Sequence, residues 1–113
     1  MRSCGNPATS FAAGILAVCE TCGAKIACTE SLTGGLLSDA FVRIPARSNV
    51  LLGSAVTYDI KAKASILHVD RSLLEREGAV HPEVARQMAA GAARLYGQPE
   101  YGDSLSGLSH HRG

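Results

Sequence analysis

The sequence contains no tryptophan, and its aromatic residues together make up only 4% of 113 residues. Eleven Lys and Arg residues stand against ten Asp and Glu residues, so the formal charge is +1, and the basic residues form no block. Nucleic-acid binding without sequence preference depends on clustered positive charge and on aromatic side chains that stack with bases. Both features are missing, and we therefore expect no nucleic-acid partner.

The sequence also lacks a long apolar run. The longest one, Phe11 to Val18, is much shorter than the roughly 20 residues that a spanning helix needs. A secretion signal that ends at Cys19 is disfavoured, because Val18 stands where such a signal needs a small residue. We expect a cytoplasmic protein that does not bind membranes.

Only half of a metal-binding cysteine pattern is present. Cys19 and Cys22 form a single C-x-x-C pair, whereas a tetrahedral zinc site needs two more ligands. The adjacent His110 and His111 lack the other ligands of a site. Half a zinc site or a redox pair remains the alternative to the interpretation that we favour, in which Cys19 lies on the buried face of a helix and Cys22 lies near the end of that helix, just before Gly23. We expect neither a metal nor a cofactor.

Apolar patterning and turn residues predict an α/β fold. Hydrophobic residues make up 46% of the chain and charged residues 19%, which indicates a well-covered core. Gly23 and Pro45 mark helix ends, and Pro82 marks a helix start. Helices are expected over residues 10–22, 34–44, 62–67 and 82–96, strands over 25–29 and 50–58, and a short capped turn over 70–78.

Composition divides the chain into three parts. Residues 1–9 are expected to be a flexible N-terminus, and residues 10–97 a single small domain. Residues 98–113, QPEYGDSLSGLSHHRG, are rich in Gly and Ser and show no periodicity. Their few apolar side chains do not offset the entropy lost when a backbone is ordered. We expect this tail to be disordered or unrelated to the domain, and to pack little against it.

The segment Thr29-Glu30-Ser31-Leu32-Thr33-Gly34-Gly35 lies between a predicted strand and a predicted helix. The N–H groups of a first helical turn are unpaired, and glycines allow a ligand to approach the backbone closely. Such a turn suits an anion, either a phosphate or the oxyanion of acyl transfer. Ser31 stands on the bend, where its hydroxyl could act as a nucleophile. The simpler alternative is that Ser31 or Thr33 caps the helix, as these residue types commonly do.

A serine nucleophile needs a proton acceptor, and Lys61 and Lys63 follow the second predicted strand. If the two strands are parallel, their C-terminal ends meet at one edge of the sheet. A lysine acts as a base only where desolvation or nearby positive charge lowers its pKa from about 10.4. We predict that Ser31, Tyr58 and Lys63 converge at this edge, although the spacing does not choose between the two lysines.

These segments resemble the CinA C-terminal domain family, the competence/damage-inducible nicotinamide mononucleotide deamidases. Residues 30–35 are similar to the family signature E-S-C-T-G-G, and residues 45–48 to its P-G-S-S loop. Tyr58 and Lys63 match its Y-x4-K pattern. The resemblance runs through several ordered blocks and covers roughly residues 10–97, which makes it far more specific than any single motif.

The resemblance implies a three-layer α/β/α sandwich with a mixed sheet and a serine amidohydrolase that needs no metal. The family hydrolyses the carboxamide of nicotinamide mononucleotide to nicotinate mononucleotide and ammonia in pyridine nucleotide recycling. Carried over by position, Ser31 is the nucleophile, Lys63 its base, and Tyr58 a neighbouring hydrogen-bonding group. The implied substrate-binding residues are Glu30, Thr33, Gly34, Gly35 and Ser48.

The sequence departs from the family pattern at several positions. Leu32 replaces the signature Cys, His68 replaces a Gly, and His81 stands where the family usually has Ser. Residues 98–113 do not match the family's T-G-x-A-G-P block, so we expect a fold incomplete at the C-terminus and weak or absent activity. The alternatives are a non-catalytic CinA-like remnant and a small nucleotide-binding or oligomerisation domain, since an exposed sheet edge favours self-association.

Overall fold

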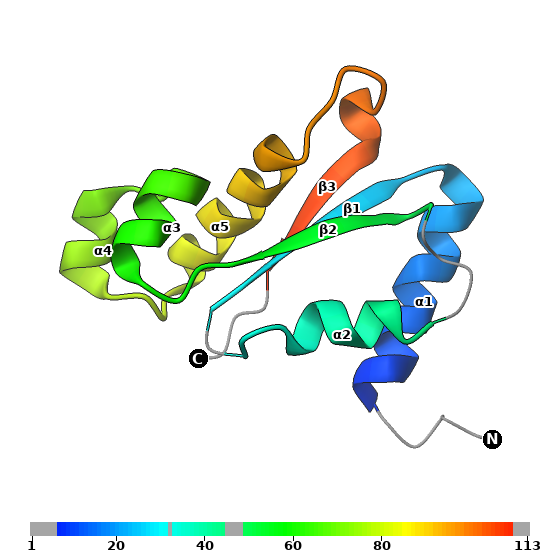
Figure 1. The fold of residues 1–113 in the computed structure, drawn as a ribbon, viewed down its shortest axis with the longest axis horizontal. Helices are drawn as coiled ribbons and strands as arrows, with labels where there is room; N and C mark the ends of the chain where they lie inside the picture. Colours follow the sequence, from blue (N-terminus) through cyan, green and yellow to red (C-terminus); the bar gives the residue numbers. More distant parts are fainter. Residues whose placement is uncertain (1–6, 32, 45–48, 110–113) are drawn as a thin grey trace.

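The computed structural model describes residues 7–31, 33–44 and 49–109 (Figure 1). Its elements, in chain order, are α1 (Pro7–Cys22), β1 (Lys25–Glu30), α2 (Leu36–Val42), β2 (Leu51–Val56), α3 (Ile60–Leu67), α4 (Arg71–Glu77), α5 (Pro82–Leu95), a 3-10 turn η2 (Gly102–Ser104) and β3 (Leu105–Ser109). The predicted α/β class is confirmed.

The sheet has the strand order β2-β1-β3, and both neighbouring pairs run parallel. Cys28 on the central strand is in register with Ser54 on one side and Leu108 on the other. Parallel neighbours need crossover connections, which the helices between them supply. The described strands therefore do not form the mixed sheet that the resemblance implied.

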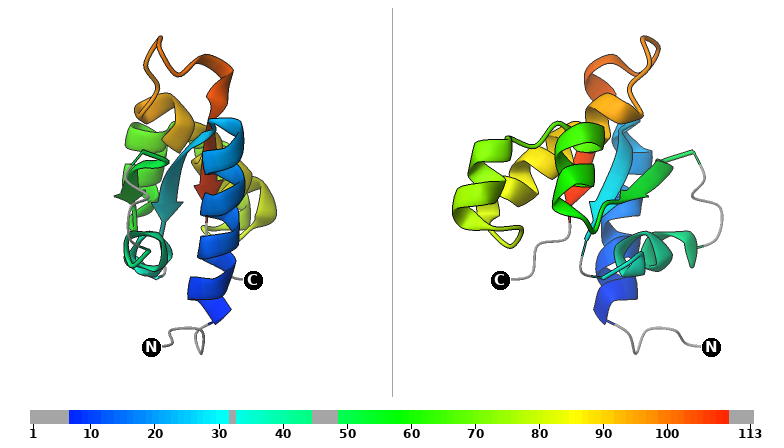
Figure 2. Two further views of the ribbon diagram at one scale, coloured as in Figure 1. Left: turned by 90° about the vertical axis from the view of Figure 1, so that its right-hand side faces the viewer. Right: turned by 60° about the vertical axis from the view of Figure 1, so that its left-hand side comes forward.

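The two faces of β1 pack against different helices. Ile26 and Cys28 belong to a buried cluster with Leu16 of α1 and Phe41 of α2, to which Leu108 of β3 adds. The alternate residues of β1 face the opposite side, where α5 packs against β1 and β3. Figures 1 and 2 show α1 and α2 on one side of the sheet and α5 on the other, with α3 and α4 beyond it. The sheet is thus the middle layer of three.

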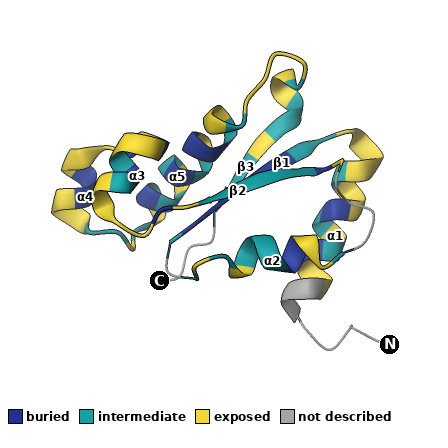
Figure 3. Cartoon of the chain, viewed as in Figure 1, coloured by how far each residue is buried: buried dark blue, intermediate teal, exposed yellow. Residues whose placement is uncertain are grey.

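Glycines allow close packing around α5. An added Cβ at Gly107 of β3 would overlap the backbone carbonyl of Ala89 in α5. An added Cβ at Gly53 of β2 would overlap the ring of Tyr96, which follows α5. Buried positions accordingly run along β1 and the facing side of α5 (Figure 3). Side chains at these glycine positions would hold α5 away from the sheet.

The structure contradicts the expectation that residues 98–113 pack little against the domain. Residues 105–109 form β3, which pairs with β1 through five register positions from Lys25 and Leu105 to Thr29 and Ser109. The Gly and Ser residues that indicated a loose tail are the small side chains that a strand under α5 requires. Leu108 packs against the cluster on the other face. This segment is part of the sheet.

Most element boundaries follow the sequence signals. Gly23 ends α1 with a φ of 74°, and Pro82 begins α5, as predicted. The second helix begins at Leu36 rather than at Gly34, because Gly35 is its N-cap with a φ of 129°. The expected short turn after residue 70 is a complete helix, α4, capped by the side chain of Asp70, which accepts the N–H of Ser72 at 3.1 Å.

Candidate functional site

Ser31 and Lys63 meet at the C-terminal edge of the sheet. Ser31 lies on the bend directly after β1, and Lys63 lies one turn into α3, which follows β2. The Ser31 Oγ and Lys63 Nζ atoms are 2.7 Å apart. The strands are parallel, so both segments leave the sheet at the same edge, and the predicted convergence of the serine and the lysine is confirmed.

Lys63 is fully buried, with a side chain that has no exposed surface. Its Nζ donates to the carbonyl oxygens of Thr57 and, at 2.8 Å, Tyr58. Burial lowers the pKa of Lys63 from its usual value, and the negative charge of Asp59 opposes part of that shift. The described residues place no carboxylate in hydrogen-bond contact with the amine. These surroundings favour the neutral amine more than water does.

Glu30 occupies the site at the start of α2 where the sequence suggested that an anion could bind. Its buried carboxylate accepts the N–H groups of Leu37 at 2.7 Å and Ser38 at 3.0 Å, and that of Gly35 at 3.2 Å. The hydroxyls of Thr33 and Ser38 add bonds of 2.6 and 3.1 Å. Burial alone would raise the pKa of Glu30, but these hydrogen bonds outweigh it and leave the pKa lowered. The anion at this helix start is therefore part of the protein itself.

The other predicted site residues are placed as follows. Thr33 contacts Glu30, and Gly34 and Gly35 have the positive φ angles, 64° and 129°, that the turn requires. Tyr58 contributes its backbone carbonyl, while its side chain is 72% exposed. Tyr58 is therefore a hydrogen-bonding neighbour of Lys63 through its backbone rather than through its side chain. Ser48 lies outside the described residues.

The cysteine and histidine candidates form no site in the described residues. Cys19 lies on α1 and is half-buried against the core, Cys22 at the end of the same helix is exposed, and neither thiol is in a disulfide. Cys28 is buried, and burial together with the charge of Glu30 raises its pKa to about 12, which disfavours the reactive thiolate form. No group of three or more potential metal ligands occurs in residues 7–31, 33–44 and 49–109. His110 and His111 lie outside that part of the chain.

No helix in the same residues has both the length and the apolar character of a membrane span.

A family model described as the CinA C-terminal domain matches residues 8–113. The chain belongs to the CinA C-terminal domain family. That match includes the segment after residue 97, in agreement with the place of β3 in the sheet. Residues 98–113 lack the T-G-x-A-G-P block of the family, yet residues 105–109 of this segment form a strand of the sheet.

Named relatives agree with this assignment. A CinA-like protein of Desulforapulum autotrophicum is 44% identical over 86 residues, which are 76% of this chain and 20% of the relative. A putative competence-damage inducible protein of Moorella thermoacetica is 40% identical over 84 residues, 74% of this chain and 20% of the relative. The chain spans about a fifth of the length of these curated relatives.

Solved structures of the CinA family share the fold. The competence/damage inducible protein CihA from Agrobacterium tumefaciens superimposes with a TM-score of 0.73 at 34% identity, over 79% of this chain and 54% of that one. A competence or damage-inducible protein from Enterobacter asburiae gives a TM-score of 0.74 at 26% identity, over 80% and 57% of the two chains.

The sequence analysis missed two contributions to this candidate site. The role of Glu30 as the N-terminal anion of α2 was not recognised, although a Glu five residues before Gly35 is close enough to be considered. Asp59 was not singled out at all. An Asp directly before a predicted helix is a standard N-cap signal, and Asp59 caps the helix that carries Lys63.

Proposed function

We propose that this chain carries the nucleophile and base of a serine amidohydrolase, with the carboxamide of nicotinamide mononucleotide as substrate. The observation that carries the proposal is the 2.7 Å contact between Ser31 Oγ and Lys63 Nζ. Membership of the CinA family supports the substrate, since the family resemblance implies that reaction. The burial of Lys63, which lowers the pKa of its amine, supports its role as the base.

The three polar neighbours of Lys63 fit a neutral amine in one arrangement. A neutral amine has two N–H donors and one lone pair. The carbonyl oxygens of Thr57 and Tyr58 can only accept, so they take the two donors. The lone pair is left for the hydroxyl of Ser31, which can donate to it. This is the hydrogen bond that a general base needs with its nucleophile.

The chemistry follows from that hydrogen bond. Ser31 Oγ attacks the carboxamide carbon while its proton passes to Lys63 Nζ, and a tetrahedral oxyanion forms. Lys63 then gives the proton to the leaving nitrogen, ammonia departs, and an ester links the acyl group to Ser31. Water attacks the ester with Lys63 again accepting a proton. The acid is released and the serine hydroxyl is restored.

The alternative of a nucleotide-binding module that uses the start of α2 loses its main support. The N–H groups of Gly35, Leu37 and Ser38 are already bonded to Glu30. A phosphate at that position would have to displace a buried carboxylate with five hydrogen bonds. The Ser31–Lys63 pair therefore remains the better basis for a function.

The test is release of ammonia and nicotinate mononucleotide from nicotinamide mononucleotide by the full chain. We expect turnover that Ser31→Ala abolishes, with a midpoint of thermal unfolding close to that of the parent. The substitution removes one half-buried hydroxyl and leaves no cavity in the core. Because Ser31 does not belong to either buried cluster, its loss changes stability by about 1 kcal/mol at most.

Ser65→Ala is the matched control, since Ser65 is an exposed hydroxyl on α3, the helix of Lys63. It should leave turnover unchanged. Undiminished turnover in Ser31→Ala would remove the nucleophile from the mechanism. A parent chain that folds but releases no ammonia would favour the non-catalytic CinA-like remnant.

A further inference from the structure

Asp59 lies between the Tyr58 carbonyl that binds the Lys63 amine and the helix α3 that carries Lys63. It directly follows Tyr58, whose carbonyl binds the lysine amine, and it begins the helix that carries the lysine. Its Oδ2 accepts the N–H groups of Lys61 at 3.0 Å and Ala62 at 3.3 Å. Its own carbonyl accepts the backbone N–H of Lys63 at 3.0 Å. Asp59 thus anchors the first turn of α3 through both its side chain and its backbone.

The position of the Lys63 amine depends on the first turn of α3. The side chain is fully buried and its amine is held by two carbonyls at fixed places in the preceding segment. Any change in where α3 begins moves the amine relative to both carbonyls and to Ser31. The N-cap side chain of Asp59 therefore helps to set the distance between Lys63 Nζ and Ser31 Oγ.

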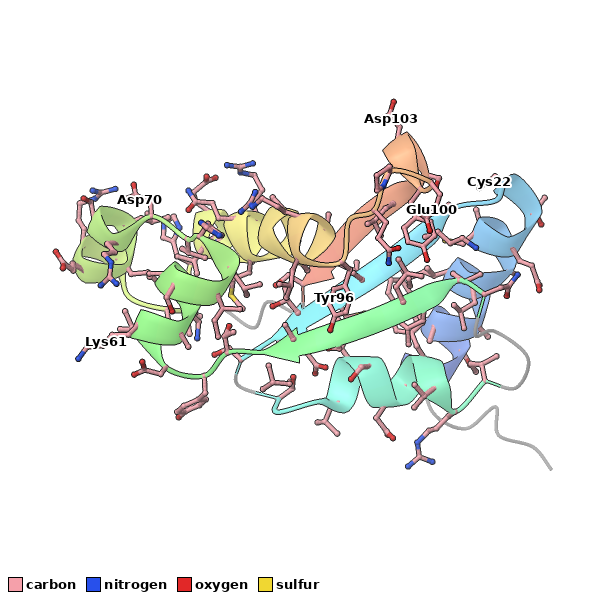
Figure 4. All side chains as sticks on the ribbon, turned by 45° about the horizontal axis from the view of Figure 1, so that its top comes forward. Cys22, Lys61, Asp70, Tyr96, Glu100 and Asp103 are labelled. Carbon is pink, nitrogen blue, oxygen red and sulfur yellow. The ribbon has the colours of Figure 1, made fainter. Side chains whose placement is uncertain are left out.

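Asp59 also places a negative charge near the amine. Its exposed carboxylate bonds to backbone N–H groups, and its charge favours the protonated amine. The other carboxylate at this edge, that of Glu30, is directed to α2 and is satisfied there. On α3 itself, Lys61 is exposed and extends outward from the helix (Figure 4).

The charged groups of α5, which packs on α3, are engaged elsewhere. Glu83 pairs with Arg86 at 2.6 Å on the exposed face of α5. Arg94 donates to the carbonyl of Leu67 at the far end of α3. His81 accepts the N–H of Glu83 through Nδ1 at the start of α5. The α5 contacts therefore leave Asp59 as the carboxylate associated with the lysine end of α3.

We propose that Asp59 is a positioning residue for Lys63: through its side-chain cap and its backbone carbonyl it fixes the first turn of α3, and so it holds the amine of Lys63 beside Ser31. The consequence for catalysis rests on the proposed amidohydrolase function. Asp59 holds the amine against Ser31 and at the same time limits how readily that amine loses its proton.

The experiment separates the charge of Asp59 from its capping role. Asp59→Asn and Asp59→Ser retain an N-cap acceptor of comparable quality and remove the charge. Lysine labelled with ¹³C at Cε reports its own protonation, and the Lys63 signal is identified by its absence in Lys63→Met. We expect the titration midpoint of Lys63 to move to lower pH in both Asp59 variants, and to move less as salt concentration rises.

Glu100→Gln is the matched control, because it removes an exposed carboxylate on the far side of the molecule from Lys61 and α3 (Figure 4). It should leave the Lys63 midpoint unchanged. A midpoint in Asp59→Asn and Asp59→Ser that is equal to or above that of the parent would overturn the proposal. So would an equal downward shift in Glu100→Gln, since the effect would then be one of net charge.

Activity provides the second readout. The acidic limb of the pH profile of kcat/KM should move to lower pH in Asp59→Asn, in step with the titration midpoint. Asp59→Ala, which also removes the cap, should lower kcat below that of Asp59→Asn because the amine is displaced from Ser31. Equal kcat in the two variants would contradict the positioning role. A parent without turnover refutes the proposed function, and the titration then decides the role of Asp59 alone.

Discussion

Lys63 is a lysine without exposed surface whose amine has no carboxylate partner in hydrogen-bond contact among the described residues. Two backbone carbonyls and a serine hydroxyl satisfy it instead. Such an environment reduces the preference for the charged form, because dipoles replace water only in part. The lowered pKa of Lys63 therefore affects both its role as a base and the pH dependence of the free energy of unfolding.

Replacement of Lys63 by Met should reveal that link through pH. In the parent, the folded-state pKa of Lys63 lies below the ordinary value of about 10.4. Between these two values the unfolded chain binds more protons, so the free energy of unfolding of the parent rises with pH. Lys63→Met lacks this contribution. We expect the stability of the parent relative to the variant to increase as pH rises toward 10, measured by urea unfolding at several pH values.

A difference in stability that stays constant across that range would show that the pKa of Lys63 is not lowered in the folded chain. Lys61→Met is the control. Lys61 is exposed on the same helix, and its replacement should give no such pH-dependent difference.

His68 is a residue where the sequence departs from the family and the backbone shows a consequence. It is the C-cap of α3 with φ 60° and ψ 34°, a left-handed conformation that glycine adopts without strain. Its side chain is exposed. We expect His68→Gly to raise the free energy of unfolding by about 0.5 to 1 kcal/mol. Thermal and urea unfolding measure it.

Ser65→Gly provides the opposite case on the same helix. Ser65 lies within α3, where glycine lowers stability by up to about 1 kcal/mol. A gain in stability from Gly at both positions, or a loss at both, would mean that the left-handed conformation of His68 is not the deciding factor.

At the scale of elements, the packing of α5 depends on small residues in strands. Gly107 of β3 lies against the carbonyl of Ala89, and Gly91 of α5 itself lies against the carbonyl of Leu67. These contacts fix how closely α5 approaches β3 and α3. They explain why residues 105–109 do not look like a strand in sequence, since strand propensity favours branched and aromatic side chains.

Gly107→Ala should therefore destabilise the protein. The added methyl meets backbone, which cannot move aside as a side chain could, and we expect a loss of about 1 to 3 kcal/mol. Ser106→Ala, at an exposed position of the same strand, should change stability by less than about 0.5 kcal/mol. Amide exchange gives a second measure, with protection along residues 105–109 in the parent and less in Gly107→Ala. Fast exchange there in the parent would contradict the pairing of β3 with β1.

The sequence predicts elements best where a local rule dominates. Gly23, Pro82 and the apolar periodicity of α5 each depend on nearby residues, and those boundaries match the structure. β3 has no such local signal, because the close packing of α5 requires a glycine at position 107 rather than a typical strand residue. The contact of Glu30 with α2 is of intermediate range, since it joins residues five to eight positions apart, and no capping rule for adjacent residues covers it.

In the candidate site, too, one feature could be predicted from the sequence and another could not. The meeting of Ser31 and Lys63 could be predicted because parallel strands bring their C-terminal ends to one edge. The outward direction of Tyr58 could not, since that depends on the local course of the chain between β2 and α3. Its carbonyl, rather than its hydroxyl, contacts the amine.

At the scale of the whole molecule, two buried clusters lie on opposite sides of the central strand. One includes Leu16 and Phe41 from α1 and α2, and the other includes Leu74 and Met88 from α4 and α5. The clusters have no residue in common. The strand β2 contacts both of them, because Leu51 packs against the first cluster and Ala55 against the second.

Leu16→Ala and Leu74→Ala test whether this connection makes the chain unfold as a unit. Both side chains are almost completely buried, with exposed fractions of 0% and 1%, so each substitution should lower the free energy of unfolding by about 2 to 5 kcal/mol. Because the two leucines belong to clusters with no residue in common, the losses should add to within about 0.5 kcal/mol in the double variant. The transitions followed by far-UV circular dichroism and by tyrosine fluorescence should coincide in every variant. If Leu16→Ala instead shifts only one of these transitions, the two sides of the sheet unfold separately, and β2 does not couple the core against α1 to the cluster that includes α3, the helix of Lys63.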